Sequence, residues 1–239
     1  MITAFPEGSP VFVAGFPVGA LQANCFLLAP AEGADCVIVD PGQDAVEPIE
    51  EALREHRLTP AAVLLTHGHF DHVFSAAELC RAHGVPVWIH PEDRPMLADP
   101  GRALGPAATA LFGGRVEMSE PDEVRELAAD QVLEVAGLSF TVDHTPGHTR
   151  GSVCFRTTTE EGGRLLFSGD TLFAGSIGRT DLPGGDTEEI MRSLKEKILP
   201  LPDDTVVLPG HGPASTIGRE RATNPFLSGG GASFPTRGL

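Results

Sequence analysis

The segment from Thr66 to His72 concentrates residues that bind metals. In the pattern His67-x-His69-x-Asp71-His72, three imidazoles and one carboxylate fall within six residues of a 239-residue chain that has nine histidines. Imidazole nitrogens and carboxylate oxygens are ligands that suit zinc, iron and similar divalent metals. Alternate residues of an extended segment point the same way, so this spacing places His67 and His69 on one side. The segment can therefore supply ligands to two adjacent metal ions.

Three later segments each place one polar side chain directly after a glycine: His148, Asp170 and His211. Glycine allows sharp backbone turns that other residues avoid, and each segment follows an apolar run typical of a strand. One such loop is weak evidence for a site, but together with the first motif they give five histidines and two aspartates. Two metal ions that shared Asp170 as a bridge would each have four protein ligands, with positions left for a bridging hydroxide.

The apolar pattern predicts the strands that hold these loops. Residues 36–39 and 61–65 are continuously apolar, as in strands that are covered on both faces. The second of these strands leads directly into the histidine-rich segment. The other predicted strands are residues 11–16, 23–28, 85–89, 132–135, 138–142, 153–156, 165–167 and 206–208.

Apolar residues at helical spacing predict three helices, over about residues 44–58, 71–83 and 187–198. Asp44, followed by Glu47, resembles a capping box at the start of the first helix. Many strands with helices inserted at intervals predict an α/β fold. Two layers of sheet faced by helices would satisfy this pattern.

No change of composition divides the chain, so we expect residues 1–226 to form a single domain. Residues 91–114 contain four prolines and predict an irregular excursion near the mouth of the site, with a short helix at residues 107–112. The Gly/Ser-rich residues 227–239 predict a mobile tail.

The composition limits the classes of partner. The chain carries 17 Lys and Arg against 33 Asp and Glu, a net charge of −16. Nucleic acids and anionic membranes need basic surfaces, so neither is an expected partner. The expected partner is a small molecule.

The four cysteines are scattered without paired spacing, which favours buried free thiols. No basic segment precedes an apolar run at the N-terminus and no apolar stretch is long enough to span a membrane, so we expect a cytoplasmic location.

The order of these motifs resembles the metallo-β-lactamase fold superfamily, and the match covers nearly the whole chain. The resemblance implies an αββα sandwich of two mixed sheets flanked by helices, with the site at one edge of the sheets. It also implies two divalent metal ions, with zinc as the expected metal and iron and manganese as alternatives. The implied ligands are His67, His69 and His148 for the first metal, Asp71, His72 and His211 for the second, and Asp170 as the bridge.

Within this superfamily, residues 176–185 are similar to glyoxalase II-like hydrolases and to the related persulfide dioxygenases. Other branches fit less well. Asp170 stands where the commonest true β-lactamases have cysteine. The acylhomoserine lactonases use a tyrosine, whereas this chain has none, and flavodiiron proteins carry glutamate at the position of His69.

The glyoxalase II resemblance implies hydrolysis of a thioester such as an acyl-glutathione. A divalent metal lowers the pKa of its bound water to about 7, which makes hydroxide available at neutral pH. Asp71 would ligate the second metal and orient that hydroxide, so it is the expected catalytic residue. Glyoxalase II continues after its last histidine into a helical region that holds glutathione, whereas 28 residues follow His211 here. The thiol carrier is therefore open.

Two other functions are open from the sequence. In persulfide dioxygenases a single iron is held by the residues that match His67, His148 and Asp170, which leaves positions for oxygen and a persulfide. The chain could also be a binding protein that keeps a metal for folding. Structural zinc sites are usually closed and rich in cysteine, and the seven His and Asp candidates argue against that reading.

Four further residues have candidate roles around the metals. Asp40 and Asp181 are candidates for orienting the ligand imidazoles, although turn and cap roles suit them equally. Arg179 is a candidate for binding an anionic substrate, and so is Arg150. Internal ion pairs are the favoured role for both arginines.

Overall fold

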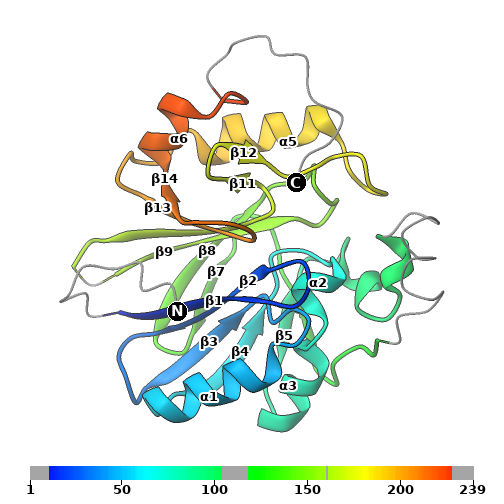
Figure 1. Ribbon diagram of the computed structural model, residues 1–239, viewed down its shortest axis with the longest axis vertical. Helices are drawn as coiled ribbons and strands as arrows, with labels where there is room; N and C mark the ends of the chain where they lie inside the picture. The colour runs from blue at the N-terminus through cyan, green and yellow to red at the C-terminus, as the bar shows by residue number, and fades with distance from the viewer. Residues whose placement is uncertain (1–10, 104–117, 160, 228–239) are drawn as a thin grey trace.

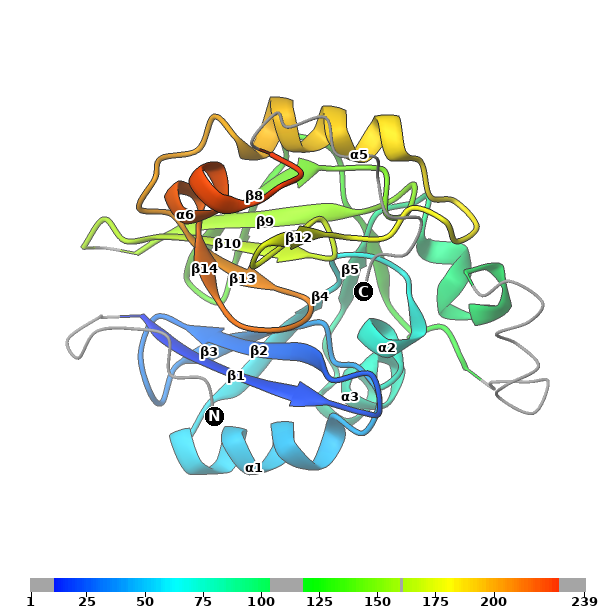
Figure 2. The same ribbon diagram turned by 45° about the horizontal axis from the view of Figure 1, so that its top comes forward.

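The computed structural model describes residues 11–103, 118–159 and 161–227. Two six-stranded sheets pack face to face, and helices cover both outer faces (Figures 1 and 2). The layers follow the order helix, sheet, sheet, helix. The αββα sandwich expected from the sequence is therefore confirmed.

The first sheet is built from the N-terminal half of the chain, in the order β1-β2-β3-β4-β5-β6. Its first three strands are antiparallel, and β3 to β6 run parallel to one another. The strands are β1 (Phe12–Val18), β2 (Ala23–Ala29), β3 (Asp35–Val39), β4 (Thr59–Leu64), β5 (Val87–Ile89) and β6 (Val124–Glu126).

The second sheet has the order β14-β13-β10-β9-β8-β7. In this sheet β10 and β13 run parallel, and the other neighbouring strands are antiparallel. The strands are β7 (Val132–Val135), β8 (Leu138–His144), β9 (Val153–Thr158), β10 (Arg164–Gly169), β13 (Val206–Pro209) and β14 (Ser215–Thr216); β11 (Leu172–Phe173) and β12 (Ser176–Ile177) form a separate small hairpin.

Strand β3 lies between the second sheet and the helices that cover the first sheet. Val37 and Val39 face the second sheet and pack in a core that includes Phe155 and Phe167. Successive side chains of a strand point to opposite faces, so Ile38 faces the other way, toward the helices. Both faces of the strand are buried, as its continuously apolar sequence predicts. Burying each large apolar side chain contributes about 1.5–3 kcal/mol.

The helices cover the outer faces of the sheets. On the first sheet, α1 (Val46–His56) and α3 (Ala76–His83) bury Ile49 and Leu79. On the second sheet, α5 (Thr187–Ser193) continues into the π-turn η3 (Leu194–Ile198), and α6 (Ile217–Thr223) packs in the same cluster. The predicted helix over residues 187–198 is therefore present, but its last turn is wider than an α-helical turn.

Two helical predictions need correction. Asp44 has a left-handed φ of 58°, so α1 begins after Ala45 and no side chain caps it. The predicted helix over residues 71–83 is two helices, α2 (Phe70–Val73) and α3. The break lies at Ser75, whose backbone N–H and hydroxyl donate to the carbonyls of Pro41 (3.0 Å) and Gly42 (2.6 Å).

The predicted short helix at 107–112 lies outside the described residues, as do 228–239 of the predicted tail. Two short 3₁₀ turns, η1 (Arg94–Leu97) and η2 (Pro100–Arg102), lead into the first of these segments. In the part of the chain that the structure describes, no helix has the length and apolar character to span a bilayer.

Candidate metal centre

The ends of several strands converge at one edge of the sandwich. His67 follows β4, and His69 stands in extended conformation just before α2, whose first turn carries Asp71 and His72. From the second sheet, His148 lies between β8 and β9, Asp170 follows β10 and His211 follows β13. Parallel strands end at the same edge of a sheet, so both halves of the chain deliver ligand-type residues there.

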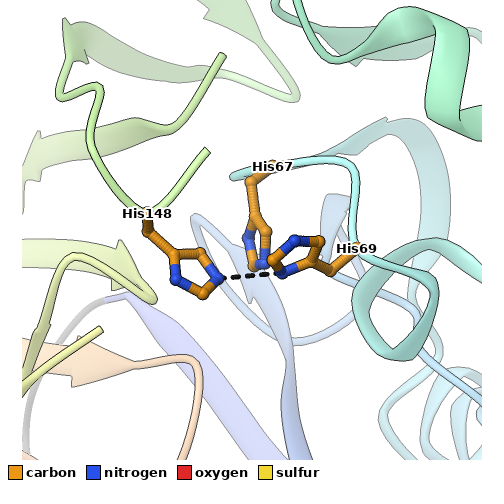
Figure 3. A group of neighbouring side chains, drawn as sticks. All are labelled: His67, His69 and His148. Atoms are coloured by element: carbon orange, nitrogen blue, oxygen red, sulfur yellow. Dashed lines mark hydrogen bonds between the residues drawn. The ribbon is translucent and has the colours of Figure 1, made fainter. Parts of the chain in front are cut away.

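The first group consists of His67, His69 and His148, and one ring nitrogen from each lies within 4.8 Å of those of the other two (Figure 3). Two of the rings come from the β4–α2 loop, and the third comes from the opposite sheet. His148 Nε2 is 2.9 Å from His69 Nδ1. The three histidines therefore face a common point.

Hydrogen bonds at the back of the rings determine which nitrogens face that point. His148 Nδ1 lies 2.8 Å from the carbonyl oxygen of Arg179, which only accepts, so Nδ1 carries the proton. The Thr66 hydroxyl donates to Asp40 (2.6 Å) and can accept from His67 Nδ1 (3.0 Å). In both imidazoles the Nε2 lone pair is then free toward the centre, as metal-binding histidines require.

The second group consists of Asp71, His72 and His211. His211 Nε2 lies 3.3 Å from Asp71 Oδ2 and 3.3 Å from His72 Nε2. Asp40 Oδ2 lies 3.1 Å from His72 Nδ1 and can accept a hydrogen bond from it, which leaves His72 Nε2 facing the centre. A single carboxylate, Asp40, thus orients ligand-type histidines in both groups, directly for His72 and through Thr66 for His67.

Asp170 stands between the two groups. Its Oδ2 lies 3.5 Å from His148 Nε2 in the first group, and its Oδ1 lies 3.4 Å from His72 Nε2 in the second. The backbone of Gly210 passes so close that a Cβ there would collide with Asp170 and approach His72 to 2.8 Å. This is the position that a carboxylate shared by two ions would occupy.

The two groups differ in charge. Burial, followed by repulsion from neighbouring imidazoles, lowers the pKa of His69 to about 3 and that of His67 well below its usual value. Burial also lowers the pKa of His72, but the carboxylates of Asp170 and Asp71 outweigh it and raise the pKa to about 10. The first group is therefore neutral, whereas the second already balances carboxylates against cationic rings. Metal binding would displace the protons of the second group.

The residues fit divalent cations. Among the described residues, His67 Nε2 and Asp170 Oδ1 are buried without a hydrogen-bond partner. Leaving such a group unpaired costs about 1–3 kcal/mol, and a bound cation would remove that cost. The donors are nitrogen and oxygen atoms only, a set that suits borderline divalent metals. We conclude that the two clusters are suited to a dinuclear metal site, whose metal they do not identify.

The other sequence candidates lie around this centre. Asp40 contacts His72, as described above. The guanidinium of Arg179 binds the carboxylate of Asp181 at 2.7 and 2.8 Å, while its carbonyl oxygen holds His148. The Arg179 side chain is therefore engaged internally. Arg150 lies two residues beyond His148, and its carbonyl oxygen accepts a hydrogen bond from His144 (2.9 Å).

Asp93 is a functional candidate that sequence reasoning missed. It is buried, and its carboxylate accepts hydrogen bonds from Gly68 N (2.9 Å), Thr149 Oγ1 (2.6 Å) and Gly151 N (2.7 Å). Gly68 separates two candidate ligands and Thr149 follows a third, so Asp93 ties together the loops of the first group. Its segment carries no motif, and only the tertiary contact reveals this role.

The family model for the metallo-beta-lactamase superfamily matches residues 18–211. This chain belongs to that superfamily. Hydroxyacylglutathione hydrolase GloC of Haemophilus influenzae is 38% identical to it over 212 residues, which are 89% of this chain and 96% of GloC. The probable metallo-hydrolase YqgX of Bacillus subtilis is 39% identical over 89% of this chain and 96% of YqgX.

Two solved structures resemble this superfamily member closely. The BLEG-1 B3 metallo-β-lactamase superposes with a TM-score of 0.81 at 40% identity, covering 91% of this chain and 100% of that one. TTHA1623, solved in a di-iron-bound form, superposes with a TM-score of 0.74 at 40% identity, covering 90% and 100%. The likeness therefore extends over nearly the full described chain.

Proposed function

We propose that this superfamily member hydrolyses a thioester formed between an acyl group and a small thiol. The observation that carries the proposal is the 38% identity to hydroxyacylglutathione hydrolase GloC across nearly the whole of both chains. The edge of the sandwich, where two groups of ligand-type residues share Asp170, supports a hydrolytic centre. We further propose zinc as the metal and the cytoplasm as the location.

The side chains at the centre have distinct proposed roles. His67, His69 and His148 would hold one cation, Asp71, His72 and His211 the other, and Asp170 both. When bound, such cations supply a coordinated water of lowered pKa and stabilise charge that develops on a carbonyl oxygen.

Asp71 is the proposed orienting residue for the water. Burial raises its pKa, but attraction to His72 and the hydrogen bond from His211 outweigh burial and hold the pKa below its usual range. The carboxylate therefore stays ionised at neutral pH and accepts hydrogen bonds. Water adds to the thioester carbonyl carbon, the C–S bond breaks, and an acid and a thiol result. A thiolate leaves readily, so no separate general acid is required.

The proposal is tested with S-lactoylglutathione and purified protein of measured metal content. We expect the thioester absorbance to decay, the decay to stop when a chelator removes the metal, and zinc to restore it. His69→Ala should abolish turnover, whereas Arg54→Gln, on the exposed surface of α1, should not. Metal-loaded protein that leaves the thioester intact would refute the proposed function.

A second candidate is β-lactam hydrolysis, which the 40% identity to the BLEG-1 B3 metallo-β-lactamase favours despite the sequence argument from Asp170. A chromogenic cephalosporin in the same assay tests for β-lactam hydrolysis.

The oxidative alternative, a persulfide dioxygenase with iron at His67, His148 and Asp170, predicts oxygen uptake with glutathione persulfide. Comparing the three substrates on one preparation distinguishes the three reactions.

A further inference from the structure

A pocket of about 290 Å³ lies beside the metal centre. At about 30 Å³ for each water molecule in the liquid, it has room for about ten waters, which is the size of one or two amino acids. Three separate segments form its walls: η1 with η2, the residues after His148, and the loop before α5. Figures 1 and 2 show that loop, in yellow, beside the green 3₁₀ turns. The lining residues used below are Glu92, Asp93, Arg102, Thr149, Arg150 and Gly184.

Two walls of this pocket also adjoin the candidate ligand histidines. Asp93 accepts hydrogen bonds from Gly68 and Thr149, which adjoin His69 and His148 in the sequence. Arg150 is two residues from His148, so their Cα atoms are at most about 7.6 Å apart. A substrate of a few residues' length, at about 3.3–3.6 Å per residue, can reach the metal centre with one end and this pocket with the other.

Arg150 is an exposed cation in the lining of the pocket. No described residue forms an ion pair or hydrogen bond with its guanidinium, and its stem packs 3.9 Å from where a Cβ of Gly184 would lie. By contrast, Arg179 in the neighbouring loop is fully engaged with Asp181. A guanidinium presents paired donors that match a carboxylate.

Two neighbours define the rest of the charge pattern. Arg102 also lines the pocket, and its contact with Asp99 is long, at 3.5 Å, and exposed. Such a surface pair contributes little, so Arg102 is free to exchange Asp99 for a bound anion. Glu92 supplies one carboxylate on the same wall. Together with Asp93 it balances the two arginines, so the pocket presents both signs of charge within a protein whose net charge is −16.

We propose that this pocket binds the charged end of the thiol carrier, with Arg150 and Arg102 on a carboxylate and Glu92 on an ammonium group. The substrate class is then a thioester of a small peptide or amino-acid thiol, in preference to a neutral thiol. This inference rests on the proposed thioesterase function and goes beyond it, because it assigns the carrier and the residues that select it.

The test compares two thioesters that carry the same acyl group. One is the glutathione ester, whose carrier is charged, and the other is the N-acetylcysteamine ester, whose carrier is neutral. For metal-loaded Arg150→Gln we expect KM for the glutathione ester to rise about tenfold, equivalent to about 1.4 kcal/mol. KM for the N-acetylcysteamine ester should stay within about twofold. Arg54→Gln removes an exposed charge elsewhere and should change neither value.

A binding measurement makes the result independent of turnover. Calorimetry with S-methylglutathione, which cannot be hydrolysed, should show binding to the wild-type protein and about tenfold weaker binding to Arg150→Gln. Arg102→Gln should weaken it in the same direction. If neither ester is hydrolysed but Arg150→Gln still weakens S-methylglutathione binding, the pocket is supported and the thioesterase function fails.

Three outcomes would overturn the assignment of the pocket. The first is an equal rise in KM for the charged and neutral esters in Arg150→Gln. The second is an unchanged KM for both. The third is a wild-type protein that does not bind S-methylglutathione.

Discussion

Replacing Asp93 with asparagine should loosen the metal centre without touching a candidate ligand. The aspartate accepts three hydrogen bonds, from two backbone N–H groups and one hydroxyl, and joins the loops on either side of the first group. Asparagine has the same shape, but one of its oxygens becomes an NH₂ group. At least one buried donor must then face another donor.

The size of the effect follows from that count. One buried donor left without an acceptor costs about 1–3 kcal/mol. The hydrogen bonds that persist also become weaker, because their acceptor no longer carries a negative charge. We expect Asp93→Asn to lower the free energy of unfolding by about 2–4 kcal/mol. Losing a group that orients metal ligands typically weakens metal binding about 10–100-fold, and we expect a loss in that range.

The assay pairs chemical denaturation with competition for zinc by a chromophoric chelator. Asp143→Asn is the matched control, because Asp143 is buried like Asp93 but binds Arg156, outside the ligand loops. The control should lose stability and keep its zinc affinity. If Asp93→Asn binds zinc as tightly as the wild-type protein, or if the control loses affinity equally, Asp93 does not hold the ligand loops in place for the metal.

Three other predictions follow from the packing. Gly210→Ala should lose bound metal while remaining folded, because its Cβ would displace the Asp170 carboxylate; metal analysis and circular dichroism check this. Burial, and then His144, lower the pKa of His90 to about 4, so the unfolded chain binds a proton that the folded chain does not. Stability should therefore fall by about 1–2 kcal/mol from pH 6.5 to pH 4, discounted for partial exposure, and His90→Phe should flatten that profile in denaturant titrations. The four cysteines are free and buried, so Ellman's reagent should react with them only after denaturation.

The sequence predicted the fold well where burial alone determines the structure. Continuously apolar runs such as β3 are strands because both of their faces are covered, and that pattern is local. The seven candidate ligands also meet at one edge, because each follows a strand end. The same local reasoning predicted four free thiols in the interior, which the structure confirms.

Features that depend on distant contacts could not be predicted in this way. The break between α2 and α3 arises because Ser75 donates to a turn more than thirty residues earlier in the chain, at Pro41 and Gly42. Asp44 looked like a cap, but its left-handed backbone turns the chain before α1 begins. Asp93 has no sequence signal, since its three donors come from separate loops.

We propose that two groups of side chains, joined by Asp170, hold two cations. Equilibrium dialysis of the metal-stripped protein against zinc, followed by elemental analysis, tests it most directly. We predict two zinc ions for each wild-type chain and a loss of stoichiometric binding in Asp170→Ala. A wild-type protein that binds no zinc, iron or manganese, or an Asp170→Ala variant that still binds two ions with unchanged affinity, would contradict the account.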